Sequence, residues 1–328
     1  MRVGVLDSDG NFDNIFFKNK HLTILRKDNI KDKRENIITH GEYVCSHIFR
    51  ENPDVEIILV PVINYNMKCS VQDLIDGINL LMDCEVDIIN MSIGDEYKYH
   101  YELEEICRRA WHRGILIVAA HSNNNVKATY PADFLFVLGV RCMNESNPQK
   151  IMRYIEEKNE IYFSSSYFSL YHLGIPKLLS GNSFACAKIT GMLSHHKETY
   201  KEYLREFEIS KFNLYYPYKL LKKKTSYLLT DRLDDPLEHK FMRDVTNTVK
   251  YEGFPEGLKK SLIDKKRFTV LFIDHSNYNE ILPYKEEIKR YINENPDKEI
   301  VLRFPLFGLE ERMVLYKEYG IVINQFYI

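Results

Sequence analysis

Apolar residues along the first two hundred positions gather in short unbroken runs. These runs alternate with segments in which apolar residues recur every three or four positions. The runs predict buried strands over residues 3–7, 55–62, 86–91, 115–120 and 135–140, and the spaced segments predict helices over 40–49, 71–82, 103–112 and 184–194. Unbroken apolar strands separated by helices are typical of a parallel sheet covered on both faces. We therefore expect an α/β fold, a three-layer α/β/α arrangement with a mainly parallel sheet.

The pattern changes after the first two hundred residues and returns near the C-terminus. Residues 206–262 are rich in Tyr, Lys, Glu and Asp, and predict a connecting helical segment without a clear strand. Strands over 268–273, 299–304 and 321–327, with helices over 284–293 and 309–319, then predict a small C-terminal β-α-β-α-β unit. This unit has no glycine-rich phosphate loop, so a nucleotide cofactor is unsupported. We expect three parts, at 1–205, 206–262 and 263–328.

Composition narrows the classes of function and the compartment. Of 328 residues, 45% are hydrophobic and 28% are charged, and the net charge of -2 gives no basis for binding nucleic acid or an anionic membrane. The six cysteines are scattered without zinc-site spacing, as in a reduced cytosolic protein. The chain opens on an apolar strand rather than a signal peptide, and it has no apolar run long enough for a transmembrane helix. We expect a cytoplasmic protein without a metal or cofactor.

Four polar residues lie at the ends of predicted elements. Asp7 ends a strand in VGVLDSDG, His40 opens a helix in THGEYVCSHI, Asn123 follows a strand in GILIVAAHSNN, and Ser183 opens a helix in SGNSFACAKITGML. In a parallel α/β sheet, strand carboxyl ends and the helix N-termini that follow them share one rim, where ligands bind. We therefore expect the four side chains to converge. Taken singly, each also fits an ordinary role, as a turn, loop, helix-start or N-cap residue.

A carboxylate, an imidazole, a carboxamide and a hydroxyl are sufficient for acyl transfer. Ser183 would attack a carbonyl carbon, and His40 would accept its proton and later donate that proton to the leaving amine. Asp7 would hold the imidazole tautomer and stabilise the imidazolium. Asn123, with the main-chain N–H of Ser183, would bind the developing oxyanion.

The chain order of Asp7, His40 and Ser183 resembles that of the subtilisin-like serine proteases, the subtilases. The stretches VLDSDG, HGEYVCSHI, INMSIG, VAAHSN, YPADF and GNSFACAKITG are similar to motifs of that family, in the same order, and cover about residues 1–200. The resemblance implies a subtilisin-like fold and assigns the oxyanion role to Asn123. It also implies the substrate-binding residues, which are Ser92, Ile93, Gly94, Ala120, His121 and Ser122.

Some positions depart from the usual family pattern. Asp9 enlarges the aspartate stretch, Glu42 follows the His-Gly pair, and His121-Ser122 replace a small residue and a glycine. Asn182 stands where the family usually has threonine, directly before the expected nucleophile. None of these is a triad member, so they bear on substrate range more than on the chemistry.

The resemblance implies an intracellular serine endopeptidase that acts on a peptide or protein through an acyl-enzyme. We expect no N-terminal propeptide and no strong dependence on calcium. The expected target is a dedicated substrate, such as the leader of a ribosomally made, modified peptide, bound as an added strand along Ser92–Gly94. Asp95, Glu96 and Asp9 hint at basic side chains near the scissile bond, although ordinary solvated acids are the preferred explanation.

Two further classes of function fit the same sequence. A catalytically inactive subtilase-like protein would bind peptides without cleaving them. A gated or regulatory protein would bind a protein partner through the C-terminal unit, which we expect to be a docking or structural addition rather than a second enzyme. Labelling of Ser183 by a fluorophosphonate probe separates the inactive class from an active protease.

Overall fold

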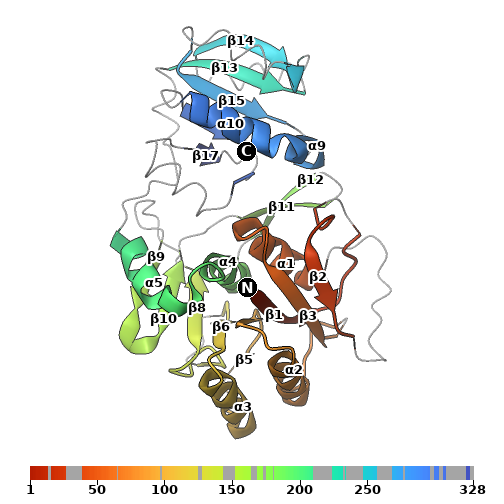
Figure 1. The fold of residues 1–328 in the computed structure, drawn as a ribbon, viewed down its shortest axis with the longest axis vertical. Coiled ribbons are helices and arrows are strands. Elements are labelled where there is room, and N and C mark those ends of the chain that lie inside the picture. The colour runs from red at the N-terminus through yellow and green to blue at the C-terminus, as the bar shows by residue number, and fades with distance from the viewer. Residues whose placement is uncertain are drawn as a thin grey trace. The chain divides into compact units, whose positions relative to one another are not determined.

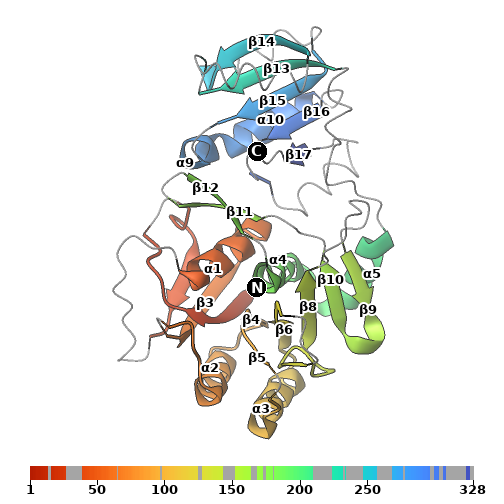
Figure 2. The same cartoon turned by 180° about the vertical axis from the view of Figure 1, so that it is seen from behind.

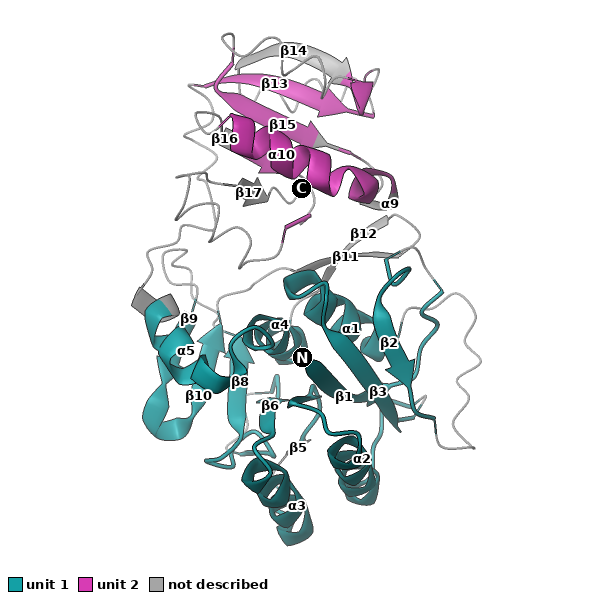
Figure 3. Ribbon diagram, viewed as in Figure 1, with its two compact units in different colours: residues 1–168, 179–211 teal, residues 169–178, 212–328 magenta. Residues whose placement is uncertain are grey.

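The chain forms two compact units in a computed structural model, residues 1–168 with 179–211 and residues 169–178 with 212–328 (Figure 3). The described residues are 1–13, 16–26, 39–64, 66–96, 98–124, 128–142, 152–163, 168–172, 175–179, 181–209, 224–231, 233, 247–256, 268–275, 278–295, 299–302, 306–307 and 323–325.

A sheet of eight strands, in the order β2-β3-β1-β4-β6-β8-β10-β9, forms the centre of the first unit (Figure 1). Its strands are β1 (Arg2–Ser8), β2 (His21–Ile24), β3 (Glu56–Ile63), β4 (Ile88–Met91), β6 (Leu116–Ala120), β8 (Leu138–Cys142), β9 (Met152–Ile155) and β10 (Glu160–Phe163). Neighbouring strands are parallel, except that β9 and β10 are antiparallel. In register, Val5 of β1 lies between Leu59 of β3 and Asn90 of β4.

Helices cover both faces of this sheet (Figures 1 and 2). On one face, α1 (His40–Glu51) contacts α4 (Asn182–Leu193), and on the other α2 (Val71–Asp83) contacts α3 (Tyr101–His112). Successive strand residues point to opposite faces. Ile89 thus packs with the core of α2 and α3, whereas the side chain of Asn90 bonds to Thr190 of α4. A further helix, α5 (Tyr200–Ile209), contacts β9. The predicted α/β/α arrangement with a mainly parallel sheet is confirmed.

Glycine allows α1 and α4 to approach closely. A Cβ atom at Gly191 of α4 would lie 2.7 Å from the main-chain oxygen of Ile48 of α1, and one at Gly41 would lie 2.1 Å from the main-chain oxygen of Ser8. Both distances are too short for a real Cβ atom, so these positions require glycine. The N-terminus of α1 can therefore lie directly on the carboxyl end of β1.

Smaller elements complete the described chain. Strands β5 (Asp95–Glu96) and β7 (Thr129–Tyr130) pair antiparallel, and β11 (Phe168–His172) pairs with β12 (Ile175–Leu179). Short 3₁₀ helices cover Glu156–Lys158, Lys197–Thr199 and Leu282–Tyr284. All six cysteines are free.

The second unit contains a parallel sheet in the order β14-β13-β15-β16-β17. Its elements are β13 (Thr225–Thr230), β14 (Asn247–Gly253), β15 (Val270–Asp274), α9 (Tyr278–Ile281), α10 (Lys285–Glu294), β16 (Glu299–Leu302) and β17 (Ile323–Gln325). The first strand in the sequence thus lies between the second and the third, which is the order of a doubly wound sheet.

The expectation of a connecting segment without strands over 206–262 is wrong, because β13 and β14 lie within it. Their sequences, TSYLLT and NTVKYEG, contain at most three consecutive apolar residues, so they lack the longer unbroken run used to predict strands. The predicted strands 268–273, 299–304 and 321–327 overlap β15, β16 and β17, and the helix 284–293 overlaps α10. The predicted helix 309–319 lies outside the described residues. The boundaries at 205 and 262 stay a prediction.

Candidate active site

The carboxyl end of β1 provides a buried carboxylate. The side chain of Asp7 has no solvent exposure, and its Oδ1 atom accepts a hydrogen bond of 2.7 Å from the main-chain N–H of Ser8. Strand β1 lies in the middle of the sheet, between β3 and β4. A charge in such a place needs a polar partner, because burial of an unpaired carboxylate is strongly unfavourable.

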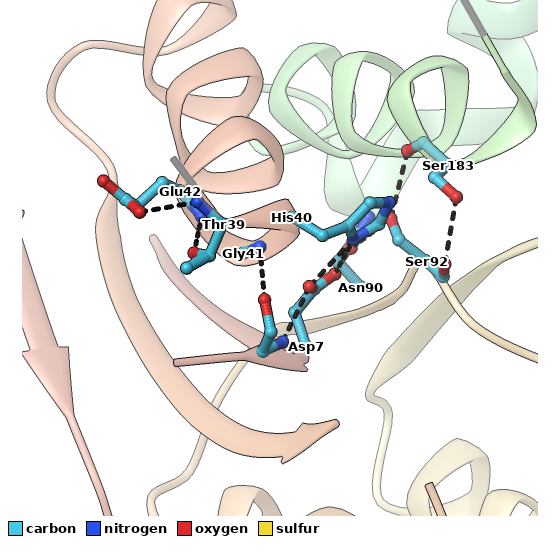
Figure 4. A network of polar contacts seen from close by, with 9 residues as sticks. Asp7, Thr39, His40, Gly41, Glu42, Asn90, Ser92 and Ser183 are labelled. Carbon is cyan, nitrogen blue, oxygen red and sulfur yellow. Dashed lines mark hydrogen bonds and ion pairs between the residues drawn. The ribbon is translucent and has the colours of Figure 1, made fainter. Parts of the chain in front are cut away.

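That partner is His40, the first residue of α1. Its Nδ1 atom lies 2.9 Å from both Oδ1 and Oδ2 of Asp7 (Figure 4). The helix start is fixed in two ways. Thr39 and Glu42 form a capping box, in which each side chain accepts from the main-chain N–H of the other, and the N–H of Gly41 donates to Ser8 Oγ at 2.9 Å. These contacts fix the start of α1 at the carboxyl end of β1, from which the imidazole reaches Asp7.

The electrostatics of this pair favour a basic imidazole. Burial by itself lowers the pKa of His40, but the charge of Asp7 and its hydrogen bond raise it, and the net result is a pKa above the usual 6.5. The Asp7 contact also places the ring proton on Nδ1, which leaves Nε2 as the proton-accepting atom. His40 can therefore act as a base whose strength depends on Asp7.

Ser183 lies in the first turn of α4, next to the end of β4. Its Oγ atom donates to the main-chain oxygen of Ser92 at 3.1 Å, and Ser92 Oγ donates to the main-chain oxygen of Ser183 at 3.0 Å (Figure 4). The ring of Phe184, the next residue, lies 5.5 Å from the His40 ring, centroid to centroid. In Figure 4 the imidazole lies between Asp7 and Ser183. The first N–H groups of a helix have no partner within the helix, so the main chain at Ser183 can offer a donor to an anion.

Asn123 lies beside the turn that leads into α4. Its Oδ1 atom accepts from the main-chain N–H of Asn182 at 2.9 Å. Gly181, with φ of 146°, is next to the same carboxamide: a Cβ atom there would be 3.5 Å from Oδ1 and 3.6 Å from Nδ2. Because the carbonyl oxygen of the carboxamide is bound to α4, the Nδ2 group is the remaining donor of Asn123. The structure thus brings Asn123 close to the Ser183 turn.

The predicted substrate segments differ in their surroundings. Ser92 is buried and its hydroxyl bonds to Asn90 and Ser183. Ile93 is half-buried and Gly94 is exposed. Directly after Gly94, β5 pairs with β7. On the other segment, Ala120 is buried in β6, and the N–H of Ser122 donates to Thr129 Oγ1 at 3.1 Å.

The imidazole of His121 is buried beside two carboxylates. Its Nε2 atom lies 3.2 Å from Oε1 of Glu160 and its Nδ1 atom 3.7 Å from Oδ2 of Asp133. Burial, together with the nearby Arg141, lowers the pKa of His121 to about 4 although the two carboxylates raise it. The ring is therefore surrounded by charged groups of the protein itself, and the main-chain N–H and oxygen of His121 bond to Val140 and Asn182, so the predicted role of His121 in substrate binding stays a prediction.

The structure gives little support to Asp9, Asp95 and Glu96 as residues that select basic side chains in a substrate. Asp9 is buried and binds Arg26 through two hydrogen bonds, from Nε at 2.7 Å and from Nη2 at 3.0 Å. Its charge is thus already compensated within the protein. The side chains of Asp95 and Glu96 lie outside the described part of the chain.

Two features of the site were missed from the sequence. The capping box of α1 has the pattern Thr-x-x-Glu at Thr39 and Glu42, which the sequence contains and which supports the helix start predicted at His40. Asn90 is fully buried and donates from Nδ2 to Thr190 Oγ1 at 2.8 Å, which links β4 to α4. A lone Asn in an apolar strand gives no sign of such a partner.

In the described part of the chain, no group of three or more His, Cys, Asp or Glu side chains is arranged to hold a metal ion. None of the helices described is long and apolar enough to cross a membrane.

Comparisons with known proteins complete the description of this site. The Subtilase family matches residues 1–214. Minor extracellular protease Epr of Bacillus subtilis strain 168 is 29% identical over 129 residues, which are 37% of this chain and 20% of that protein. A thermophilic serine proteinase of Bacillus sp. strain AK1 is 25% identical over 150 residues, 44% of this chain and 34% of that protein. The chain thus matches about a fifth and a third of the length of these two relatives.

Among solved structures, the prenylagaramide maturation protease PagA has a similar fold, with a TM-score of 0.48 and 23% identity over 58% of this chain and 73% of that chain. The family match covers more than half of the 328 residues and includes Asp7, His40 and Ser183. The chain therefore belongs to the subtilase family.

Proposed function

We propose that this subtilase is a serine endopeptidase whose triad is Asp7, His40 and Ser183. The observation that carries the proposal is the contact of His40 Nδ1 with both oxygens of the buried Asp7 carboxylate, at 2.9 Å. A buried acid that orients an imidazole beside a serine at a helix start is the arrangement required for nucleophilic catalysis. Family membership of residues 1–214 supports the same assignment.

In the proposed reaction, Ser183 Oγ attacks the carbonyl carbon of the scissile peptide bond while His40 Nε2 takes its proton. The hydroxyl donates to Ser92 in the present structure, so it must first turn toward His40, a rotation about the Cα–Cβ bond. Such hydrogen bonds often tighten only when substrate is bound. Collapse of the tetrahedral intermediate releases the amine, which receives the proton from His40, and leaves an acyl group on Ser183. Water, deprotonated by His40, then hydrolyses this ester.

The negative charge of each tetrahedral intermediate would be bound by Asn123 Nδ2 and the main-chain N–H of Ser183. The bond from Asn182 N–H to Asn123 Oδ1 supports this assignment, because it directs the amide end of the carboxamide to act as the donor. In subtilisin, loss of the side-chain donor costs about 10²–10³-fold in kcat.

The proposed substrate is a peptide that lies as an extra strand along Ser92–Gly94. Exposure of Gly94 and partial exposure of Ile93 support this segment as an accessible edge. Within this class we propose a dedicated substrate, the leader of a ribosomally made, modified peptide, and action in the cytoplasm. Candidate precursors incubated with the protein should show a discrete cut by mass spectrometry, and an absence of such a cut would count against this substrate.

The triad is tested by fluorophosphonate labelling, which needs no knowledge of the substrate. Wild type should be labelled on Ser183, and the folded Ser183→Ala variant should not be labelled. Unlabelled wild-type protein would instead favour the alternative, an inactive or gated subtilase-like protein. To test gating by the C-terminal part, a truncation should remove residues 212–328 rather than 263–328, because β13 and β14 pair with strands of the same sheet.

A further inference from the structure

The residue directly before the proposed nucleophile connects three segments of the first unit. The Nδ2 group of Asn182 donates to the main-chain oxygens of His121, at 3.0 Å, and of Ser122, at 2.8 Å. Its Oδ1 atom accepts from the main-chain N–H of Cys142 at 2.7 Å. One side chain thus joins the start of α4 to the segment after β6 and to the end of β8.

The chemistry of this contact needs a carboxamide. A primary amide has two N–H donors and a carbonyl acceptor, whereas the threonine that is usual in the family has a single hydroxyl donor. Asn182 is 7% exposed, so its hydrogen bonds lie in a medium of low dielectric, where loss of a partner leaves a buried polar group unsatisfied. The two acceptors, His121 and Ser122, are the residues immediately before Asn123.

The segment before Asn123 is held from both sides. On one side the imidazole of His121 is buried against Glu160, with Nε2 at 3.2 Å from its carboxylate. On the other side Asn182 binds the two carbonyl oxygens, and its own main-chain N–H binds Asn123 Oδ1 at 2.9 Å. The orientation of Asn123 relative to Ser183 therefore depends on one residue of the α4 turn.

We infer that Asn182 is a positioning residue for the oxyanion site, which sets the carboxamide of Asn123 relative to Ser183. The inference rests on the proposed function, because Asn123 has a catalytic role only if Ser183 is acylated. Asn182 itself does not need to touch the substrate. Because its Nδ2 and Oδ1 atoms bond to three main-chain groups, Asn182 acts by fixing the spacing between the end of β6 and the start of α4. It does not itself donate a hydrogen bond to the oxyanion.

The test is Asn182→Asp, measured by the rate of fluorophosphonate labelling. The substitution keeps the shape, the main-chain N–H and the acceptor for Cys142, but it places a carboxylate oxygen against the carbonyls of His121 and Ser122. We expect the maximal labelling rate constant to fall by about 10²-fold, the scale of a misplaced catalytic group, with little change in the probe concentration that gives half of that rate. Asn182→Thr, which keeps one donor, should give an intermediate rate. If N182D does not fold, N182T carries the test.

The matched control is Asn52→Asp. Asn52 is also buried, at 5% exposure, and donates from Nδ2 to Ser194 Oγ at 2.7 Å, but it caps the opposite end of α1 from His40. N52D should lower the melting temperature and leave the labelling rate of the folded protein unchanged. A structural role alone for Asn182 would give the same result as N52D.

A double-mutant cycle with Asn123→Ala separates action through Asn123 from other effects. If Asn182 works by placing Asn123, N182D should slow labelling much less in the N123A background than in wild type. Equal effects in both backgrounds, or N182D that labels at the wild-type rate, would overturn the inference while leaving the proposed function intact. Wild type that is not labelled at all would overturn both.

Discussion

Gly41→Ala should disable the site without touching any proposed catalytic group. The added Cβ atom would lie 2.1 Å from the main-chain oxygen of Ser8. Real Cβ atoms stay at least 3.0 Å from such atoms, so α1 and β1 must separate by about 0.9 Å. The obstacle is main chain, which cannot rotate away. A shift of that size is enough to take the 2.9 Å contact between His40 and Asp7 beyond hydrogen-bond range, which ends near about 3.5 Å.

Two opposing effects on stability accompany this change. Alanine within a helix is favoured over glycine by about 1 kcal/mol, but overpacking of a tight contact costs about 1–3 kcal/mol. We therefore expect a modest net loss of stability for G41A. Because a displacement of about 1 Å can cost about 10²-fold in rate, labelling by fluorophosphonate should slow by about that factor.

The assay compares labelling rates of folded wild type, G41A and Gly4→Ala across pH. Gly4 is the control because the three atoms nearest to its added Cβ atom all belong to the flexible side chain of Leu81 of α2, the closest at 2.6 Å. G4A should lose stability and keep the labelling rate, whereas G41A should lose rate and also shift the pH midpoint of labelling downward, as Asp7 no longer raises the pKa of His40. G41A with the rate and midpoint of wild type would refute the reasoning.

Two further predictions follow from the contacts at α1. Labelling should fail as pH drops through the raised pKa of His40, because the base must be neutral. In Asp7→Asn, burial without the carboxylate lowers the pKa of His40, so the loss of labelling should move to lower pH. The same variant should reduce the labelling rate by about 10⁴-fold. A pH–rate profile of D7N with the wild-type midpoint would contradict this account. Thr39→Ala should cost about 1 kcal/mol of unfolding free energy through loss of the bond to the Glu42 N–H, and Thr39→Ser should restore it; equal denaturation midpoints for all three proteins would exclude a stabilising cap.

The sequence was sufficient for the elements with unbroken or regularly spaced apolar residues. Strand 3–7 corresponds to β1, helix 71–82 to α2 and strand 115–120 to β6, each within two residues at either end. These elements are buried on one or both faces, and burial dictates the period of apolar residues along the chain. The same local signal placed Asp7, His40, Asn123 and Ser183 at element ends, where a parallel sheet brings them to one edge.

Elements with mixed surfaces gave no such signal. Strands β2 and β9 alternate exposed or half-buried positions with more buried ones, and both are edge strands. Strand β14 mixes apolar residues with Thr, Lys and Glu, and it is also an edge strand. Strand β13 is different: it is a buried inner strand, but its apolar run of Tyr227, Leu228 and Leu229 is too short to predict a strand. An edge strand such as β2, β9 or β14 tolerates polar residues, so its composition resembles that of a loop and only the pairing partner reveals it.

The chain by itself predicted which side chains form the proposed triad and oxyanion site and which edge of the sheet they share, because both follow from local periodicity and from the rules of parallel sheets. Only the tertiary structure decided how these groups meet. The contact of His40 with Asp7 depends on the missing side chain of Gly41, the imidazole of His121 turns toward Glu160, and Asn182 reaches three main-chain groups. Hydrogen bonds between residues far apart in the chain depend on tenths of an ångström in the packing of whole elements, and that packing is set by all their contacts together.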